Sequence, residues 1–473
     1  MLDFSDYPIA EKVFRYFEEI SKIPRGSGNT ALIADYLQAF AKMRSLEFYR
    51  DGKNNILIKK PASKGYEERP TVIIQGHTDM VAEKEPTCDK NLLTEGIDIY
   101  RDGDYLKARG TTLGGDDGIA VAYALALLDS EDIPHPAIEA LFTSDEEIGL
   151  LGADAFDKSR LTGRIMINID TDDEGIFVAG CAGGVRTDIR LPVYRGNFGG
   201  EAYSLKVSGL IGGHSGVEIN RGRGNAIKIG FRVLSCLGDI RLHSAEGGNM
   251  DNAIPREFSA IFFSDEDFER KFSDIKKDIA KEYADTDSGI KIEIVKTKVD
   301  TPPCDKETTE KILGIVNSIP FGPVAYLPGL DNMVETSLNS GIARLGDEFT
   351  LCTSLRSSSE DKKWALAKKL EAVAEKWGAE FSWRGAYPGW EYRKNSKIRD
   401  VCSQTFFDLY GREAEVITIH AGLECGLFTG EIPDLDCISF GPDNFDIHTT
   451  EERLSLSSCA RVWDFLLEVL KRI

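Results

Sequence analysis

The sequence predicts an α/β fold in which a domain with a mostly parallel sheet flanked by helices is interrupted by an inserted α+β domain. Three observations predict it. The 473 residues exceed what one hydrophobic core usually supports. Strand-like and helix-like segments alternate at both ends of the chain. Between them the pattern changes to half-exposed strands and amphipathic helices. We expect the first domain to comprise residues 1–185 and 393–473, and the insertion to comprise 186–392.

The first 185 residues supply most of the predicted parallel sheet. Short β-rich or apolar runs indicate strands at 55–59, 71–75, 138–143 and 164–169. Helices are expected at 10–20, 29–43 and 119–128, with Asn29 or Thr30 placed to cap the second. The run 119–128 is too apolar for a surface helix and is expected to lie buried against the sheet.

The insertion begins after the glycine-rich segment CAGGV, a candidate hinge. Within it we expect strands at 203–207, 258–263, 291–295 and 348–355, and helices at 225–237, 268–283 and 361–376. The α/β pattern then returns with a helix at 398–410, a strand at 416–419 and a closing helix from Ser457.

Charge and composition exclude several classes of partner. The formal net charge is 57 − 78 = −21, which argues against binding to nucleic acid or to anionic lipid. The longest apolar run, 119–128, is too short to span a bilayer. The N-terminal residues show no secretory signal, and the nine cysteines include no C-x-x-C pair. These features are typical of reduced thiols and predict a cytoplasmic protein.

Potential metal ligands fall at the ends of the predicted strands. Such residues follow 71–75 (His77, Asp79), precede the helix 119–128 (Asp116, Asp117), and follow 138–143 (Glu146, Glu147) and 164–169 (Asp170). Each acidic group alone would most often be a helix cap or a solvated turn. In an open α/β sheet, however, the loops beyond the carboxyl ends of the strands form the binding site. We therefore expect these groups to converge.

These residue types suit a site with two metal ions. Zinc binds histidine nitrogen and carboxylate oxygen, and a catalytic site leaves one position for water. Two neighbouring metals need a shared ligand, which a carboxylate can supply with its two oxygens. A ligand histidine needs its second nitrogen oriented, and Asp79 is well placed to orient His77. The Glu146-Glu147 pair could supply one ligand and one general base.

Several motifs carry a family resemblance. GHTDMV, GGDDGIA, TSDEEIGLLGA, NIDTD and IHTTEERLSL resemble the M20 metallopeptidases. MDNAIPRE, TSLRSS and IHAGLECG are similar to the aminoacyl-histidine dipeptidase branch, also called the PepD or Xaa-His dipeptidase branch. The motifs run from about residue 77 to 455, and several separated motifs in the right order are far more specific than a single match.

The resemblance implies a role for each residue of the site. It implies that His77 and Asp170 complete one metal site and that Glu147 and His448 complete the other. Asp116 would bridge the two metals, and the Asp116-Asp117 peptide bond would be cis. Glu146 would be the general base, and Asp79 would orient His77. The cofactors would be two divalent ions per subunit, zinc by preference, with manganese or cobalt as alternatives.

The insertion resembles the lid domain of the same family. His214, in GLIGGHSGVEINRGRGN, would reach the scissile carbonyl, and in dimeric relatives it does so in the partner subunit. Asn252 and Arg356 would bind the C-terminal side of the substrate, and an arginine fork suits a carboxylate. His420 could recognise the substrate's amino terminus or be a core histidine. A homodimer formed through the lid is therefore expected.

The activity implied is metal-dependent hydrolysis of dipeptides, either aminoacyl-histidine or a broader set. An N-acyl-amino-acid deacylase or an aminotripeptidase on the same scaffold is the alternative, because the metal ligands do not set substrate length. The lid motifs favour the dipeptidase. A binding protein without catalysis is the remote alternative, and the complete set of expected ligands and base argues against it.

Overall fold

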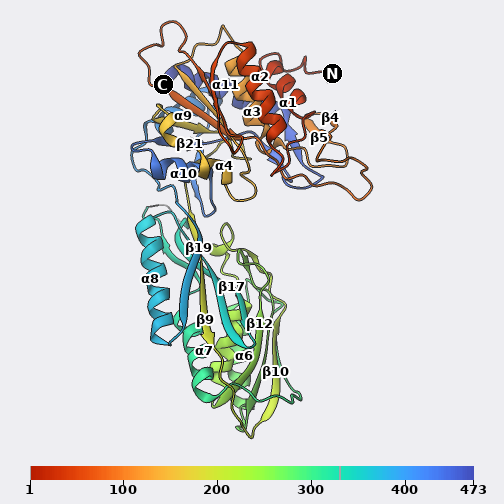
Figure 1. Cartoon of the computed structure of the whole chain (residues 1–473), viewed down its shortest axis with the longest axis vertical. Coiled ribbons are helices and arrows are strands. Elements are labelled where there is room, and N and C mark those ends of the chain that lie inside the picture. The colour runs from red at the N-terminus through yellow and green to blue at the C-terminus, as the bar shows by residue number, and fades with distance from the viewer. Residues whose placement is uncertain (1, 330–331) are drawn as a thin grey trace. The chain divides into compact units, whose positions relative to one another are not determined.

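The computed structural model describes residues 2–329 and 332–473, which form two compact units (Figure 1). Unit 1 comprises residues up to Gly180 together with Tyr392–Thr418 and Leu423–Ile473. Unit 2 comprises Cys181–Glu391 and the short piece Ile419–Gly422. The sequence-based boundaries placed that short piece in the first domain. It groups with unit 2 because the Ala182 amide donates to the carbonyls of Ile419 and Ala421, both at 3.1 Å.

An eight-stranded sheet forms the centre of unit 1. Its strands, in spatial order, are β1 (Glu47–Arg50), β2 (Ile56–Lys60), β6 (Ile138–Thr143), β3 (Val72–His77), β7 (Ile165–Asn168), β21 (Asp436–Ser439), β8 (Ile176–Cys181) and β20 (Glu415–Ile419). The four central strands, β6-β3-β7-β21, are parallel, whereas β1, β2 and β8 pair antiparallel. Both β3 and β6 are buried along their whole length, as expected for strands covered on both faces.

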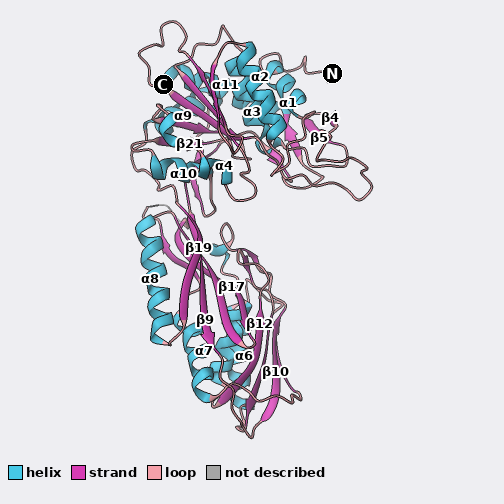
Figure 2. Ribbon diagram, viewed as in Figure 1, coloured by secondary structure: helices cyan, strands magenta, loops and turns pink. Residues whose placement is uncertain are grey.

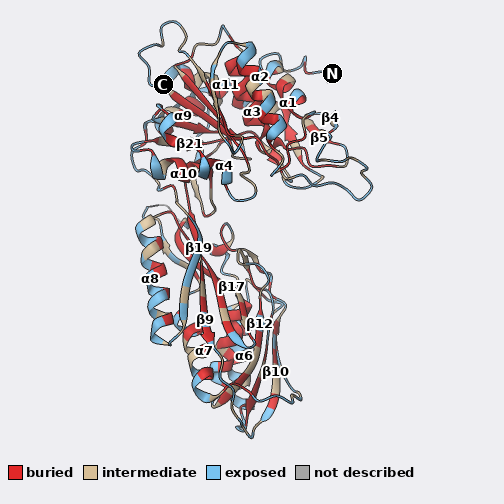
Figure 3. Ribbon diagram, viewed as in Figure 1, coloured by how far each residue is buried: buried red, intermediate tan, exposed pale blue. Residues whose placement is uncertain are grey.

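Helices flank this sheet (Figure 2). They are α1 (Glu11–Ile20), α2 (Ala31–Met43), α3 (Gly115–Leu128), α4 (Leu151–Ala155), α9 (Lys397–Tyr410), α10 (Glu424–Glu431) and α11 (Leu456–Arg472). Every residue of α3 except Asp116 is buried, which confirms the prediction for 119–128 (Figure 3). Thr30 is the N-terminal cap residue of α2, but its side chain makes no capping hydrogen bond. Among the described helices, none is long and apolar enough to cross a membrane.

A smaller four-stranded sheet completes unit 1. Its order is β22 (Asn444–Phe445), β23 (Arg453–Ser455), β5 (Tyr105–Ala108) and β4 (Ile99–Asp102). Pairing of β23 with β5 brings two regions that are far apart in the sequence next to each other. One is the loop that contains His448, between β22 and β23, and the other is the segment that leads to α3.

Unit 2 is built on a nine-stranded antiparallel sheet. Its strands run in the order β15 (Lys291–Lys296), β10 (Glu201–Ser208), β14 (Phe258–Ser264), β12 (Ile240–Gly247), β17 (Val334–Leu345), β18 (Glu348–Ser357), β9 (Gly183–Pro192) and β19 (Glu380–Tyr387), and β16 (Gly322–Tyr326) pairs with β17. The helices that accompany it are α5 (Ala226–Cys236), α6 (Glu269–Glu282), α7 (Lys306–Ser318) and α8 (Glu360–Lys376). Two very short strands, β11 (Gly213–His214) and β13 (Ala253–Ile254), pair separately.

The CAGGV segment is strand rather than loop. Strand β8 ends at Cys181 and β9 begins at Gly183, so a single residue separates them. A Cβ atom on Gly184 would lie 2.7 Å from the ring of Tyr387 on the neighbouring strand β19. The glycine is needed for this close approach.

Candidate active site

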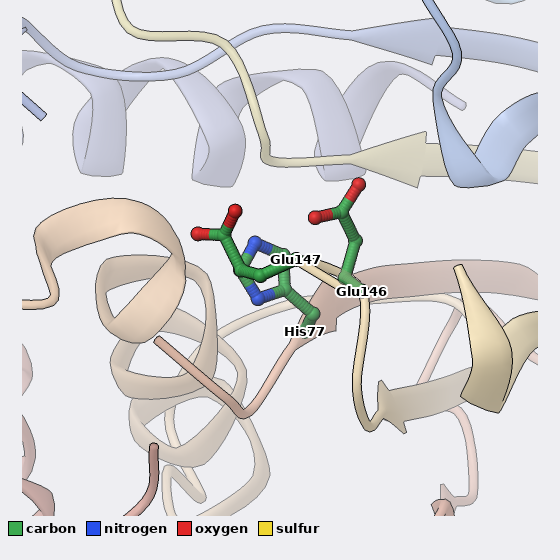
Figure 4. A group of neighbouring side chains, drawn as sticks. All are labelled: His77, Glu146 and Glu147. Atoms are coloured by element: carbon green, nitrogen blue, oxygen red, sulfur yellow. The ribbon is translucent and has the colours of Figure 1, made fainter. Parts of the chain in front are cut away.

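The predicted ligands of unit 1 lie at one edge of its parallel sheet. His77 is the last residue of β3, Glu146 and Glu147 follow β6, and Asp170 follows β7. Because β3 pairs in parallel with both β6 and β7, these strands end at the same edge. Figure 4 shows the side chains of His77, Glu146 and Glu147 gathered where β3 ends.

Two sets of potential ligands share Asp116. The first set is His77, Asp116 and Asp170, the second is Asp116, Glu147 and His448, and within each the ligand atoms lie within 4.8 Å of one another. Asp116 Oδ1 lies 2.9 Å from His77 Nε2, and its Oδ2 lies 3.1 Å from His448 Nε2. The carboxylate of Asp116 therefore directs one oxygen to each set, which is the arrangement that a ligand bridging two metals requires.

The remaining distances complete the two sets. His448 Nε2 lies 2.9 Å from Glu147 Oε1, and His77 Nε2 lies 4.0 Å from Asp170 Oδ1. His448 comes from the loop between β22 and β23, about 300 residues from its partner Glu147. The structure thus places all five predicted ligands of unit 1 together.

Asp79 contacts both His77 and the Glu146-Glu147 loop. Its side chain is fully buried, and Oδ1 lies 3.4 Å from His77 Nδ1, opposite the nitrogen that faces the ligand sets. The same carboxylate accepts hydrogen bonds from the backbone amides of Glu146 at 3.0 Å and Glu147 at 3.4 Å, and from Ser27 Oγ at 2.8 Å. Burial acts against ionisation, but the interactions with His77, Ser27 and the Glu146 amide together outweigh it, and the pKa of Asp79 is lowered. Asp79 therefore orients both the histidine and the Glu146-Glu147 loop.

Glu146 and its neighbour Glu147 differ in their hydrogen-bond partners. No described residue donates a hydrogen bond to the Glu146 carboxylate, whereas Glu147 faces His448. Burial raises the pKa of Glu146 to about 8. Within the described chain the Glu146 carboxylate thus has no hydrogen-bond donor, although one of its oxygens lies within 4.8 Å of ligand atoms of His77 and Glu147.

The electrostatics of the cluster fit divalent cations. Burial, and then the nearby charge of Asp117, raises the pKa of Asp170 well above its ordinary range. Asp116, like Asp79, departs from this: burial opposes ionisation, yet the hydrogen bonds from His448 and His77 lower the pKa of Asp116. So many buried carboxylates need positive charge to stay ionised. The imidazole nitrogens and carboxylate oxygens are ligands suited to zinc, and also to manganese or cobalt.

The first turn of α3 holds Asp116 in an unusual geometry. The Asp116-Asp117 peptide bond is cis, as the resemblance implied, and both residues depart from helical dihedral angles. Asp117 is not in either ligand set; its Oδ2 accepts a hydrogen bond from the His77 amide at 3.1 Å. A Cβ atom on Gly76 would lie 2.5 Å from that same oxygen, so the glycine is required there.

In unit 2, His214 is held in one tautomer. Its Nδ1 accepts hydrogen bonds from the backbone amides of Gly216 and Val217, both at 3.2 Å. Burial, and then the charge of Arg356, lowers the pKa of His214, so the ring is neutral at pH 7. A neutral ring that accepts at Nδ1 carries its proton on Nε2. His214 therefore presents an N–H donor.

The other three predicted residues of unit 2 lie near His214. Strand β11 pairs with β13 next to Asn252, whose carbonyl accepts from the Ser215 amide at 2.8 Å. Arg356, on β18, is buried and donates to Tyr387 Oη at 3.0 Å. His420 is buried and bonded through Nε2 to Ser337 Oγ at 2.7 Å. Burial, and then Arg356, lowers the pKa of His420 to about 3. This environment favours the core-histidine alternative for His420.

Comparisons with known proteins identify the family. Residues 73–472 match the sequence profile of Peptidase family M20/M25/M40. The chain belongs to this family. It is 34% identical to the cytosol non-specific dipeptidase of Escherichia coli strain K12 over 467 residues, which cover 97% of this chain and 96% of that protein.

Solved structures agree with the assignment to the M20 family. The crystal structure of aminoacylhistidine dipeptidase from Vibrio alginolyticus superposes with a TM-score of 0.94 at 32% identity, covering 98% of both chains. Aminopeptidase PepT from Bacillus cereus superposes with a TM-score of 0.57 at 16% identity, again covering 98% of both chains, and shares the fold. The M20 architecture of a catalytic domain with an inserted lid is thus shown for this chain.

A buried layer of polar residues that the sequence did not predict lies next to the loops of the candidate ligands. Glu424 is fully buried and accepts from Gln75 Nε2 at 2.5 Å and from Thr143 Oγ1 at 2.6 Å. Asn168 donates to Gln75 Oε1 at 2.7 Å. This layer ties α10 to β6, β3 and β7 just before the ligand loops begin. Glu424 lies within the motif IHAGLECG, but no local pattern shows that it is buried.

Proposed function

We propose that this M20 peptidase is a metal-dependent dipeptidase with two divalent ions, zinc by preference, at the site in unit 1. The observation that carries the proposal is the position of Asp116, whose two carboxylate oxygens face two different sets of ligands. The dipeptidases from Escherichia coli and Vibrio alginolyticus, each similar over nearly the whole chain, support the substrate class.

The metal ions would polarise the scissile carbonyl and acidify a water molecule. The positive charge of the metal ions would keep the Glu146 carboxylate ionised, so that Glu146 can take a proton from that water and later give it to the leaving amine. Asp79 keeps the base in place through the Glu146 amide, and it holds His77 with Nε2 facing Asp116. The two neighbouring glutamates thus divide the work, Glu147 as ligand and Glu146 as base.

Residues of unit 2 are proposed to bind the substrate. The Nε2–H of His214 donates to the carbonyl oxygen as negative charge develops on it. Arg356 pairs with the C-terminal carboxylate of the dipeptide, and Asn252 hydrogen-bonds the same end. We also propose a homodimer formed through unit 2, which sedimentation at working concentration would test; a monomer would refute it. A cytoplasmic location is proposed from the Escherichia coli relative, a cytosol dipeptidase.

The test is hydrolysis by metal-stripped protein and by protein restored with zinc, manganese or cobalt. The substrates are β-Ala-His, several α-dipeptides, a tripeptide and an N-acetyl amino acid. We expect metal-dependent cleavage confined to the dipeptides, with two ions bound per chain. Cleavage of only the tripeptide or only the acyl amino acid would overturn the substrate assignment. One ion per chain would overturn the two-metal site.

A further inference from the structure

Three of the ligand loops in unit 1 are joined by two buried, oppositely charged side chains that belong to neither ligand set. We propose that Arg25 and Glu452 are positioning residues that clamp the segment Leu113–Gly115 and thereby fix the bridging carboxylate of Asp116 relative to the loops of His77 and His448. The proposal rests on the proposed function, since it assigns what holds the metal ligands in place.

Arg25 links the His77 loop to the Asp116 loop. The residue is 2% exposed, among the largest fully buried side chains of the described chain. Its Nη1 donates to the carbonyl oxygens of Thr78 at 3.0 Å and Asp79 at 3.3 Å, directly after His77. Its Nη2 donates to the carbonyl of Gly114, two residues before Asp116. One guanidinium thus fixes the backbone on both sides of the 2.9 Å contact between His77 and Asp116.

The glycines of the GGDDG motif make room for this guanidinium. A Cβ atom on Gly114 would lie 2.6 Å from Arg25 Nη2, and one on Gly118 would lie 2.5 Å from the same atom. Gly114 also has a φ of 66°, a backbone conformation that favours glycine. Two of the three glycines in the motif therefore serve the arginine, not only the turn into α3.

Glu452 binds the same segment from the opposite side. It is 3% exposed, and Oε2 accepts from the amides of Leu113 at 2.7 Å and Gly114 at 2.9 Å, while Oε1 accepts from Gly115 at 2.7 Å. Three successive backbone N–H groups make a concave binding site for an anion, which this carboxylate fills. The Glu452 amide donates to the carbonyl of Thr449, the residue after His448, at 3.2 Å. Glu452 therefore links the His448 loop to the Asp116 loop.

The two charges complement each other across one stretch of backbone. At Gly114 the carbonyl faces Arg25 and the amide faces Glu452, so each charged side chain meets the end of the peptide dipole that suits it. A charge buried without such partners would strongly destabilise the fold. Because Asp116 must direct one oxygen to each ligand set, a shift of the backbone two residues earlier would disturb both sets at once. Partners that orient metal ligands are typically worth about 10–100-fold in metal affinity or activity.

The test uses the full-length protein and two conservative variants, Glu452→Gln and Arg25→Lys. The glutamine keeps the shape but loses one acceptor oxygen, and the lysine keeps the charge but loses the fork. The matched controls are Glu451→Gln, at the exposed residue that precedes Glu452, and Arg109→Lys, at an exposed arginine. Amide hydrogen exchange of residues 113–115 is measured without added metal, and the zinc dissociation constants are measured by competition with a chelator.

We expect slow exchange at residues 113–115 in the wild type, exchange at least about 10-fold faster in both variants, and zinc binding about 10–100-fold weaker. Exchange in β6 and the behaviour of both controls should match the wild type. Rapid exchange at 113–115 in the wild type would overturn the proposal even if a variant failed to fold. Folded variants with unchanged exchange and zinc affinity would also overturn it. A wild type that binds no metal but protects these amides would instead refute the proposed function alone.

Discussion

The two units position their candidate functional residues in different ways. In unit 1 three candidate ligands, His77, Glu147 and Asp170, lie where parallel strands end, and Asp116 and His448 come from α3 and the β22–β23 loop. These side chains contact one another directly, as His448 does with Glu147 at 2.9 Å. In unit 2 the candidates are held by backbone contacts and by non-ligand side chains, as His214 is by two amides and Arg356 by Tyr387. Regular topology places the first set, and irregular loops and long-range strand pairs place the second.

The chemistry of the two sets differs as well. Unit 1 gathers carboxylates that need positive charge, whereas unit 2 gathers hydrogen-bond donors, the Nε2–H of His214 and the guanidinium of Arg356. The proposed function accordingly assigns the metal ions and the base to unit 1 and the binding of developing negative charge to residues of unit 2. Four substitutions would break or sharpen this comparison.

The largest effect is expected for Glu146→Gln. Loss of the general base should lower kcat by about 10²–10⁴-fold while the metal content stays the same. Glu147→Gln is the matched control and should lose metal, because Glu147 faces His448 in the second ligand set. Elemental analysis beside steady-state kinetics measures both. Metal loss from Glu146→Gln would show that the two glutamates are both ligands.

The next largest effect is expected for His214→Ala. Removing the N–H donor should lower kcat by about 10²–10³-fold with both metals retained, as for other donors to a developing oxyanion. His243→Ala, at a histidine of the same unit that contacts Thr301, should leave kcat unchanged. Equal kcat in the two variants would remove His214 from the mechanism and leave unit 2 without a part in the chemical step.

Arg356→Met should act mainly on KM. A hydrogen bond to a charged group is worth about 1.5–3 kcal/mol, so KM should rise about 10–100-fold. Arg190→Met, on the neighbouring strand β9, removes a more exposed arginine whose carboxylate partner Glu348 lies 3.8 Å away, and should change nothing. A fall in kcat at unchanged KM would place Arg356 in the transition state rather than in ground-state binding.

The smallest catalytic effect is expected for His420→Ala. Ser337 would lose its buried partner, so the free energy of unfolding should fall by about 1–3 kcal/mol while KM stays the same. Urea unfolding measures the change in stability, and dipeptide kinetics measure KM. A raised KM with unchanged stability would instead make His420 a substrate ligand.

Much of the fold could be read from local patterns, and the exceptions share a cause. Strand β6 was predicted at 138–143, its observed bounds, because its apolar run is continuous. Strand β17, VETSLNSGIARL, was missed because it carries polar residues such as Asn339 and Ser340 that are nevertheless buried. Asn339 is satisfied by the carbonyls of Asp251 and Ala253, more than 80 residues away. No local pattern reveals such a partner.

The sequence by itself determined the residue types of the site and their order along the strand ends, because ligand chemistry depends on side-chain identity and strand ends follow from local hydrophobic pattern. The tertiary structure alone decided which atoms face each other. It decided that Asp116 divides its oxygens between two ligand sets, and that Arg25 and Glu452 meet at Gly114. Glu452 lies 338 residues from Gly114, and a buried charge acquires its partners only when the folded chain brings such distant segments into contact.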